Sequence, residues 1–206
     1  TGRANRKPCT NSPPYSLYRF MDLFQTNANT QKDWIDRNLP THSVFGTVLA
    51  DRGPFDPKYS GRSSSGIPYE FAPALWNQQK VDCYINVPHM ATDDFVRKMA
   101  QVFRFGSDGN LPLTADGGSP VWAPLRPESR LMVEYSNEIW SSGGSFAQGE
   151  WAQAQADALK LTKAQFNAKR SCEIWAIFAD VFGARADSQL VRVAALFTAV
   201  DSYSAD

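Results

Sequence analysis

The segment 135–140 (YSNEIW) brings a carboxamide, a carboxylate and an indole together, in Asn137, Glu138 and Trp140. It begins at the end of a short apolar run, 131–136, that predicts a β-strand. In parallel α/β folds, ligands bind at the carboxyl ends of the strands. A carboxylate at that position can act as a general acid or base on a sugar or an ester. The alternative is that Glu138 only caps a helix or forms an ion pair at the rim, and position alone favours neither.

Two further strand ends carry polar side chains. The segment INVPH (85–89) spans the end of the apolar run 81–87, which places Asn86 just before that end and His89 just after it. The apolar run 15–24 contains Arg19 and Asp22 near its end. Each has a structural alternative, since a single histidine often belongs to the core and Arg19 and Asp22 can form an ion pair beneath a site. Polar groups at three successive strand ends nevertheless favour a functional site.

Strands and helices alternate along the chain. Strands are expected at 15–24, 81–87, 131–136 and 190–200, and helices at 68–79, 93–103 and 147–182, with irregular loops at 27–66 and 106–127. Thr92 is the expected N-cap of the helix at 93–103. This order predicts right-handed βαβ units and a parallel sheet, hence an α/β fold. We expect one domain over 15–206 and a peripheral segment over 1–14.

Composition excludes several classes of function. The chain has 21 Lys and Arg against 21 Asp and Glu, whereas a nucleic-acid binder usually carries a basic excess. No apolar run reaches the roughly 18 residues of a membrane span. With two histidines and three cysteines, and no paired metal-ligand motif, we expect no metal. There is no P-loop or GxGxxG motif, and no cofactor is expected. Cys83 and Cys172 lie in apolar segments and are expected to be buried.

The pair Asn137-Glu138 within VEYSNEIW resembles the Asn-Glu motif of the retaining (β/α)8-barrel glycoside hydrolases of clan A. RFMD, which contains Arg19, and INVPH are similar to earlier strand ends of that group, and the resemblance spans about residues 15–200. It implies that the four expected strands are the second to fifth of a barrel. The implied fold class is therefore an α/β, TIM-barrel-like domain that is incomplete.

The resemblance also implies roles for individual residues. Glu138 would protonate the leaving glycosidic oxygen and then activate water, and Asn137 would hold the sugar 2-hydroxyl. The remaining residues would orient the nucleophile (Arg19), line the sugar site (Tyr135 and Trp140) and contact sugar hydroxyls (Asn86 and His89). By the same resemblance, the partner is an oligo- or polysaccharide and the location is extracellular or periplasmic.

One part of the family pattern is absent. A retaining glycosidase needs a second carboxylate about 5–5.5 Å from the first, and in this clan it ends the seventh strand. A complete barrel typically has about 250 residues, so we expect a partial chain with weak or no hydrolysis on its own. Two alternatives remain open. One is a non-catalytic carbohydrate-binding barrel fragment. The other is a hydrolase that uses Glu138 and His89 on an ester or amide.

Overall fold

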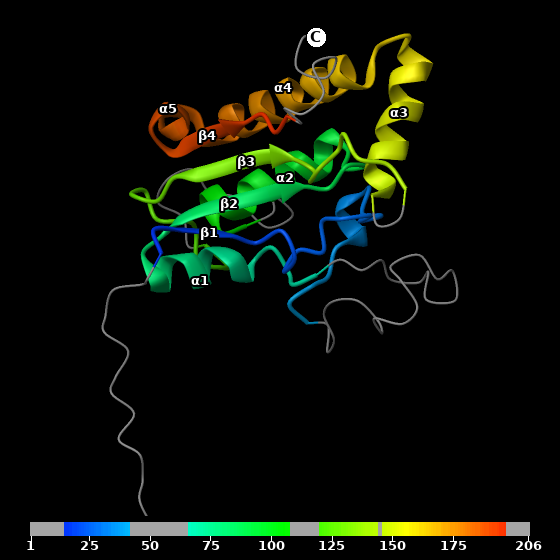
Figure 1. Cartoon of the computed structure of the whole chain (residues 1–206). Helices are drawn as coiled ribbons and strands as arrows, with labels where there is room; N and C mark the ends of the chain where they lie inside the picture. The colour runs from blue at the N-terminus through cyan, green and yellow to red at the C-terminus, as the bar shows by residue number, and fades with distance from the viewer. Residues whose placement is uncertain (1–14, 42–65, 108–119, 144–145, 197–206) are drawn as a thin grey trace, which may run out of the picture.

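The computed structural model describes residues 15–41, 66–107, 120–143 and 146–196. Four strands form one parallel sheet whose spatial order follows the chain: β1 (Leu17–Arg19), β2 (Asp82–Val87), β3 (Leu131–Tyr135) and β4 (Leu190–Val193) (Figure 1). Every neighbouring pair is parallel. The expected α/β class with a parallel sheet is therefore confirmed, and the arrangement is compatible with part of a (β/α) barrel.

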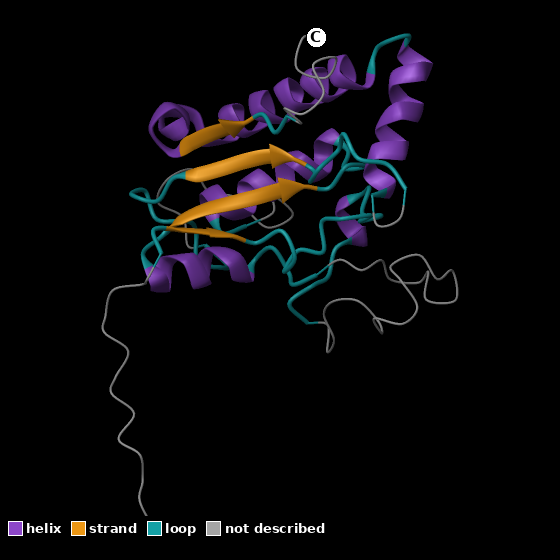
Figure 2. Ribbon diagram, in the orientation of Figure 1, coloured by secondary structure: helices purple, strands orange, loops and turns teal. Residues whose placement is uncertain are grey.

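The helices connect the strands (Figure 2). They are η1 (Trp34–Asp36), α1 (Phe71–Gln79), α2 (Asp93–Phe105), α3 (Ala147–Leu159), α4 (Lys163–Phe182), η3 (Gly183–Arg185) and α5 (Ala186–Gln189). Among the described residues, no helix has both the length and the apolar character needed to cross a bilayer.

The single helix expected over 147–182 is wrong, because the structure divides it into α3 and α4. Lys160 adopts a left-handed conformation with φ 58° and ends α3. Thr162 then caps α4: its side chain accepts a hydrogen bond from the backbone N–H of Gln165, and the Gln165 side chain accepts one from the N–H of Thr162. This reciprocal capping box stops one helix and starts the next.

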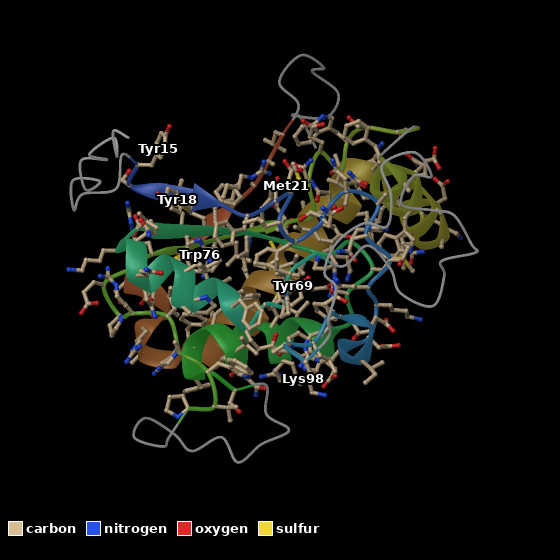
Figure 3. The ribbon with its side chains drawn as sticks, turned by 90° about the horizontal axis from the view of Figure 1, so that it is seen from below. Tyr15, Tyr18, Met21, Tyr69, Trp76 and Lys98 are labelled. Carbon is tan, nitrogen blue, oxygen red and sulfur yellow. The ribbon has the colours of Figure 1, made fainter. Side chains whose placement is uncertain are left out.

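The helices α1, α2 and α4 pack on one face of the sheet (Figures 1 and 3). Sequential strand order explains this, since right-handed crossovers that always step in the same direction leave every connecting helix on the same side. Side chains alternate along β2, so Cys83, Ile85 and Val87 lie in the core with Trp76 of α1 and Phe95 of α2. The alternate side chains point to the opposite face, among them Tyr84, Asn86 and Glu134.

Helix α2 follows its sequence signals closely. The Thr92 side chain accepts a hydrogen bond from the Phe95 backbone N–H, 3.3 Å away, and so acts as the expected N-cap. Its buried residues include Val96 and Met99. The helix runs two residues past the expected end and stops at Gly106, where φ is 71° and an added Cβ would lie 1.9 Å from the Trp122 carbonyl oxygen.

Other boundaries differ from expectation. The strand expected over 15–24 is limited to β1, and the chain then turns, with Phe20 and Phe24 buried against Trp76. The apolar run therefore indicated that these side chains are buried, and not that the whole segment is a strand. The strand expected over 190–200 ends at Val193, and residues 197–200 lie outside the described part, as do 1–14.

The two cysteines in described segments behave differently. Cys83 is buried in β2, as expected. Cys172 is exposed on α4, so its expected burial was wrong. The apolar neighbours of Cys172 in the sequence face the sheet, because helical side chains point in several directions within one turn.

Candidate functional site

A buried carboxylate near the carboxyl end of β3 organises a polar cluster on the face of the sheet opposite the helices. Glu134 is 3% exposed, and its Oε2 accepts hydrogen bonds from Arg19 Nη2 at 2.8 Å, from the Tyr84 hydroxyl at 2.9 Å and from Asn86 Nδ2. The strand register explains the contacts, because Glu134 lies opposite Asn86, and Arg19 lies opposite Tyr84. Burying a charge is costly unless it is paired and hydrogen-bonded, and these three donors meet that requirement.

Tyr84 is a donor in this cluster over a wide pH range. Burial raises the pKa of Tyr84 to about 12, and the nearby negative charge of Glu134 acts in the same direction. The phenol therefore stays protonated and donates to the carboxylate. The Arg19 guanidinium also lies 4.8 Å from the centre of the Tyr84 ring. The cation consequently contacts both the ring and the acid.

Arg19 extends the cluster to the end of β3. Its Nη2 also donates to Asn137 Oδ1 at 2.8 Å, and Asn137 Nδ2 donates to Asn27 Oδ1 at 2.9 Å. Asn86 Nδ2 donates in addition to the Ser136 carbonyl oxygen. Three residues expected from sequence, Arg19, Asn86 and Asn137, are thus brought together. Arg19 pairs with Glu134 rather than with Asp22, which is exposed.

Glu138 lies immediately after this cluster, on a tightly turned backbone. Ser136 and Glu138 have φ of 58° and 43°, a left-handed conformation that non-glycine residues rarely adopt. The Glu138 carbonyl accepts a hydrogen bond from the Ser141 N–H at 2.9 Å, which closes the turn. The Glu138 side chain is half-buried. Strained backbone of this kind costs about 1–3 kcal/mol per residue and clusters at functional sites.

The start of α3 holds this turn in place. An added Cβ at Gly149 would lie 1.4 Å from the Ser141 carbonyl oxygen, so only glycine permits the close approach of helix and turn. Lys163, the first residue of α4, donates from Nζ to the Trp140 carbonyl oxygen at 2.8 Å, and partial burial lowers the pKa of this lysine. Trp140 itself is half-buried.

Tyr135 and His89 lie apart from the Glu134 cluster. Tyr135 alternates with Glu134 along β3, so it points into the core, and its hydroxyl donates to the His89 carbonyl oxygen at 2.9 Å. The His89 ring is 3% exposed and packs edge-on against Trp151, with 5.6 Å between ring centres. Burial lowers the pKa of His89 to about 4, so its imidazole is neutral at pH 7.

The Gln148 side chain of α3 also belongs to the site, because its Nε2 donates to Asn27 Oδ1 at 3.0 Å and to the Asn137 carbonyl oxygen at 2.9 Å. Sequence reasoning missed four members of the site: Asn27, Tyr84, Glu134 and Gln148. The one available signal was Glu134 itself, a charged residue inside an otherwise apolar strand. Among the described residues, no group of three or more His, Cys, Asp or Glu side chains is arranged to hold a metal ion. The polar groups present are suited to hydrogen bonding and proton transfer.

Comparisons with protein-family models, with curated proteins and with solved structures found no match for this chain. The chemistry of the site therefore has to be inferred from the cluster around Glu134 and from the turn that carries Glu138.

Proposed function

We propose that this chain carries the general acid/base part of a retaining glycoside hydrolase site, on part of a (β/α)8-type barrel. The observation that carries the proposal is the placement of Glu138 just past the carboxyl end of β3, on a left-handed turn next to Asn137. Asn137 is in turn hydrogen-bonded to Arg19. Ligand sites of parallel α/β folds lie at this end of the strands, and the substrate class rests on the resemblance of VEYSNEIW to clan A.

In this mechanism the protonated carboxyl of Glu138 gives its proton to the glycosidic oxygen as the bond to the sugar carbon breaks. A second carboxylate, acting as nucleophile, takes the sugar carbon in a covalent ester. The ionised Glu138 then takes a proton from water, whose oxygen attacks the same carbon and releases the nucleophile. Asn137 supplies an amide beside the reacting sugar, and no cofactor takes part in these steps.

A carbohydrate-binding module without turnover is the second candidate. The observation in its favour is the state of Glu134, the only carboxylate in the hydrogen-bonded cluster of described residues. Its Oε2 is occupied by Arg19, Tyr84 and Asn86. It is also 3% exposed, so it is poorly placed to attack a sugar carbon. The nucleophile of the enzyme proposal has to come from outside this cluster.

Substituting Glu138→Gln separates the two candidates. Binding is measured by calorimetry on gluco-, xylo- and manno-oligosaccharides, and hydrolysis by the release of reducing ends from the same sugars. If Glu138 is the acid/base, the variant retains binding and loses hydrolysis by about 10²–10⁴-fold, the usual contribution of such a group. The control is Glu128→Gln, whose side chain is 72% exposed and lies before β3, at the opposite end of the strand from Glu138.

The outcomes discriminate clearly. Saccharide binding without any hydrolysis favours the binding module when the protein tested also contains the second carboxylate, because without that carboxylate the enzyme candidate would also bind and not cleave. Equal loss in Glu138→Gln and Glu128→Gln removes Glu138 from the mechanism. A wild-type protein that neither binds nor cleaves any of these sugars refutes both candidates.

A further inference from the structure

Gln148, at the start of α3, is completely buried and uses both ends of its carboxamide. Its Oε1 accepts from the Ala28 backbone N–H at 2.9 Å. Its Nε2 donates to Asn27 Oδ1 at 3.0 Å and to the Asn137 carbonyl oxygen at 2.9 Å. A fully buried polar side chain with every contact satisfied is a strong restraint on its neighbours. Gln148 therefore ties the loop after β1 to the turn after β3.

These bonds form a continuous chain, which we call the amide relay, through the side chains of Gln148, Asn27 and Asn137. Asn27 Oδ1 accepts from both Gln148 Nε2 and Asn137 Nδ2. Asn137 Oδ1 then accepts from Arg19, whose guanidinium also donates to Glu134. The relay thus runs from a backbone N–H at one end to the ion pair between Arg19 and the buried Glu134 at the other.

The chemistry of the two ends fixes the direction of every amide between them. A backbone N–H can only donate, and a guanidinium can only donate. Gln148 must therefore turn its oxygen to Ala28 and its nitrogen to Asn27. Asn137 must turn its oxygen to Arg19 and its nitrogen to Asn27. Reversing any one amide would place two donors or two acceptors in contact. The free-energy cost would then be about that of desolvating each unpaired group.

We propose that Gln148 is a positioning residue that fixes the orientation of the Asn137 carboxamide beside Glu138. Asn137 then offers its remaining Nδ2 hydrogen, so the ligand group that it contacts has to accept a hydrogen bond. A sugar hydroxyl oxygen meets this requirement. Only this contact between Asn137 and a sugar rests on the proposed function. The orientation of Asn137 is a property of the free protein and is tested without any ligand.

Two matched substitutions at adjacent links test the relay. Both Asn27→Asp and Gln148→Glu replace an amide nitrogen with oxygen. Asn27→Asp keeps an acceptor facing Gln148 and Asn137. Gln148→Glu turns a donor into an acceptor, and its carboxylate then faces Asn27 Oδ1 and the Asn137 carbonyl oxygen. A general effect of adding negative charge would act at both positions. A hydrogen-bond donor is replaced by an acceptor facing another acceptor only at Gln148.

The readout is the side-chain amide resonance pair of Asn137 in unliganded, 15N-labelled protein, assigned by its absence in Asn137→Asp. Asn27→Asp keeps the acceptor of this amide, so it should leave the hydrogen exchange no faster than in wild type, although the carboxylate moves the two shifts. Gln148→Glu should move both resonances and speed exchange about tenfold, the factor for losing one net hydrogen bond. If Gln148→Glu does not fold, Asn27→Leu takes its place, because Asn27 is half-buried and the substitution removes the shared acceptor.

Unchanged Asn137 resonances in folded Gln148→Glu, or in Asn27→Leu where that variant replaces it, overturn the proposal. Equal speeding of exchange by Asn27→Asp and Gln148→Glu overturns it as well, since the replacement of a donor by an acceptor at Gln148 would then be irrelevant. Absence of saccharide binding in the wild-type protein refutes the proposed function and leaves the amide result standing. The two failures are therefore distinguishable.

Discussion

Lowering the pH should destabilise the fold through His89. The ring is 3% exposed and packs against Trp151, and burial lowers its pKa from 6.5 to about 4. The unfolded chain therefore binds a proton at this position more tightly than the folded chain does. The free energy of unfolding should be unaffected by His89 above pH 6.5, should fall as the pH drops below that value, and should reach its full loss near pH 4.

The size of the effect follows from the two pKa values. A depression from 6.5 to about 4 corresponds to about 3 kcal/mol, at 1.36 kcal/mol for each pKa unit. The variant His89→Leu removes the titrating ring and keeps an apolar side chain beside Trp151. Its cost at pH 7 should be about 1 kcal/mol or less, because volume-conserving changes in a core are tolerated best. At pH 4 the wild type has lost about 3 kcal/mol of stability through protonation of His89, which exceeds the cost of the substitution. The variant should then be the more stable protein by about 2 kcal/mol.

The assay is urea unfolding followed by tryptophan fluorescence at several pH values from 4 to 8. The difference in unfolding free energy between wild type and His89→Leu cancels the carboxylates that titrate in the same range. The control is His42→Leu, the same substitution at the other histidine of the chain. A difference that stays constant from pH 7 to pH 4 would show that His89 titrates normally, and would refute the burial argument.

Two further substitution pairs test packing, both by urea unfolding. Gly149→Ala should destabilise the protein by about 3 kcal/mol, an overpacking cost, because its Cβ would lie 1.4 Å from the Ser141 carbonyl oxygen. A Cβ added at Gly143 meets no atom within 4 Å, so Gly143→Ala should cost only about 1 kcal/mol, for the left-handed φ of 79°. Equal costs for the two glycine substitutions would contradict the close packing of α3 against Ser141. Trp76→Ala should cost about 3–5 kcal/mol, since Trp76 is fully buried. Leu75→Ala, on the same helix and 43% exposed, should cost less than about 1 kcal/mol; the reverse order would refute the assigned burial of α1.

The order of elements could be predicted because it depends on local patterns. The apolar run 81–87 differs from β2 by one residue, and the Thr92 cap was recognised from residue type and spacing. The predictions failed where one sequence pattern is compatible with two different local structures. The apolar side chains of Phe20 and Phe24 are compatible with a strand or with a turn. Their packing against Trp76 stabilises the turn. In 147–182, the apolar face continues across Lys160, and only the cap at Thr162 marks the break.

The site was predictable in part for a related reason. Asn137 and Glu138 are adjacent in sequence and stand at a strand end, so their pattern is local. The importance of Glu134 depends on partners 48 to 115 residues away in the chain. Nothing in the sequence around Glu134 shows that Arg19 will lie opposite Tyr84 and reach across to β3. The strand register creates that contact, and the register is a property of the folded sheet.

Glu134 and Glu138 have different surroundings because β3 ends between them. Glu134 lies within β3, so its direction is fixed by the pleat and its charge is balanced by Arg19. Glu138 lies beyond the strand, on a left-handed turn, and is half-buried. Because Arg19 already balances Glu134, the nucleophile that a retaining reaction requires has to be a carboxylate outside the cluster. Hydrolysis by a protein that contains such a group, lost in Glu138→Gln while sugar binding persists, is therefore the result that decides between the enzyme and the binding module.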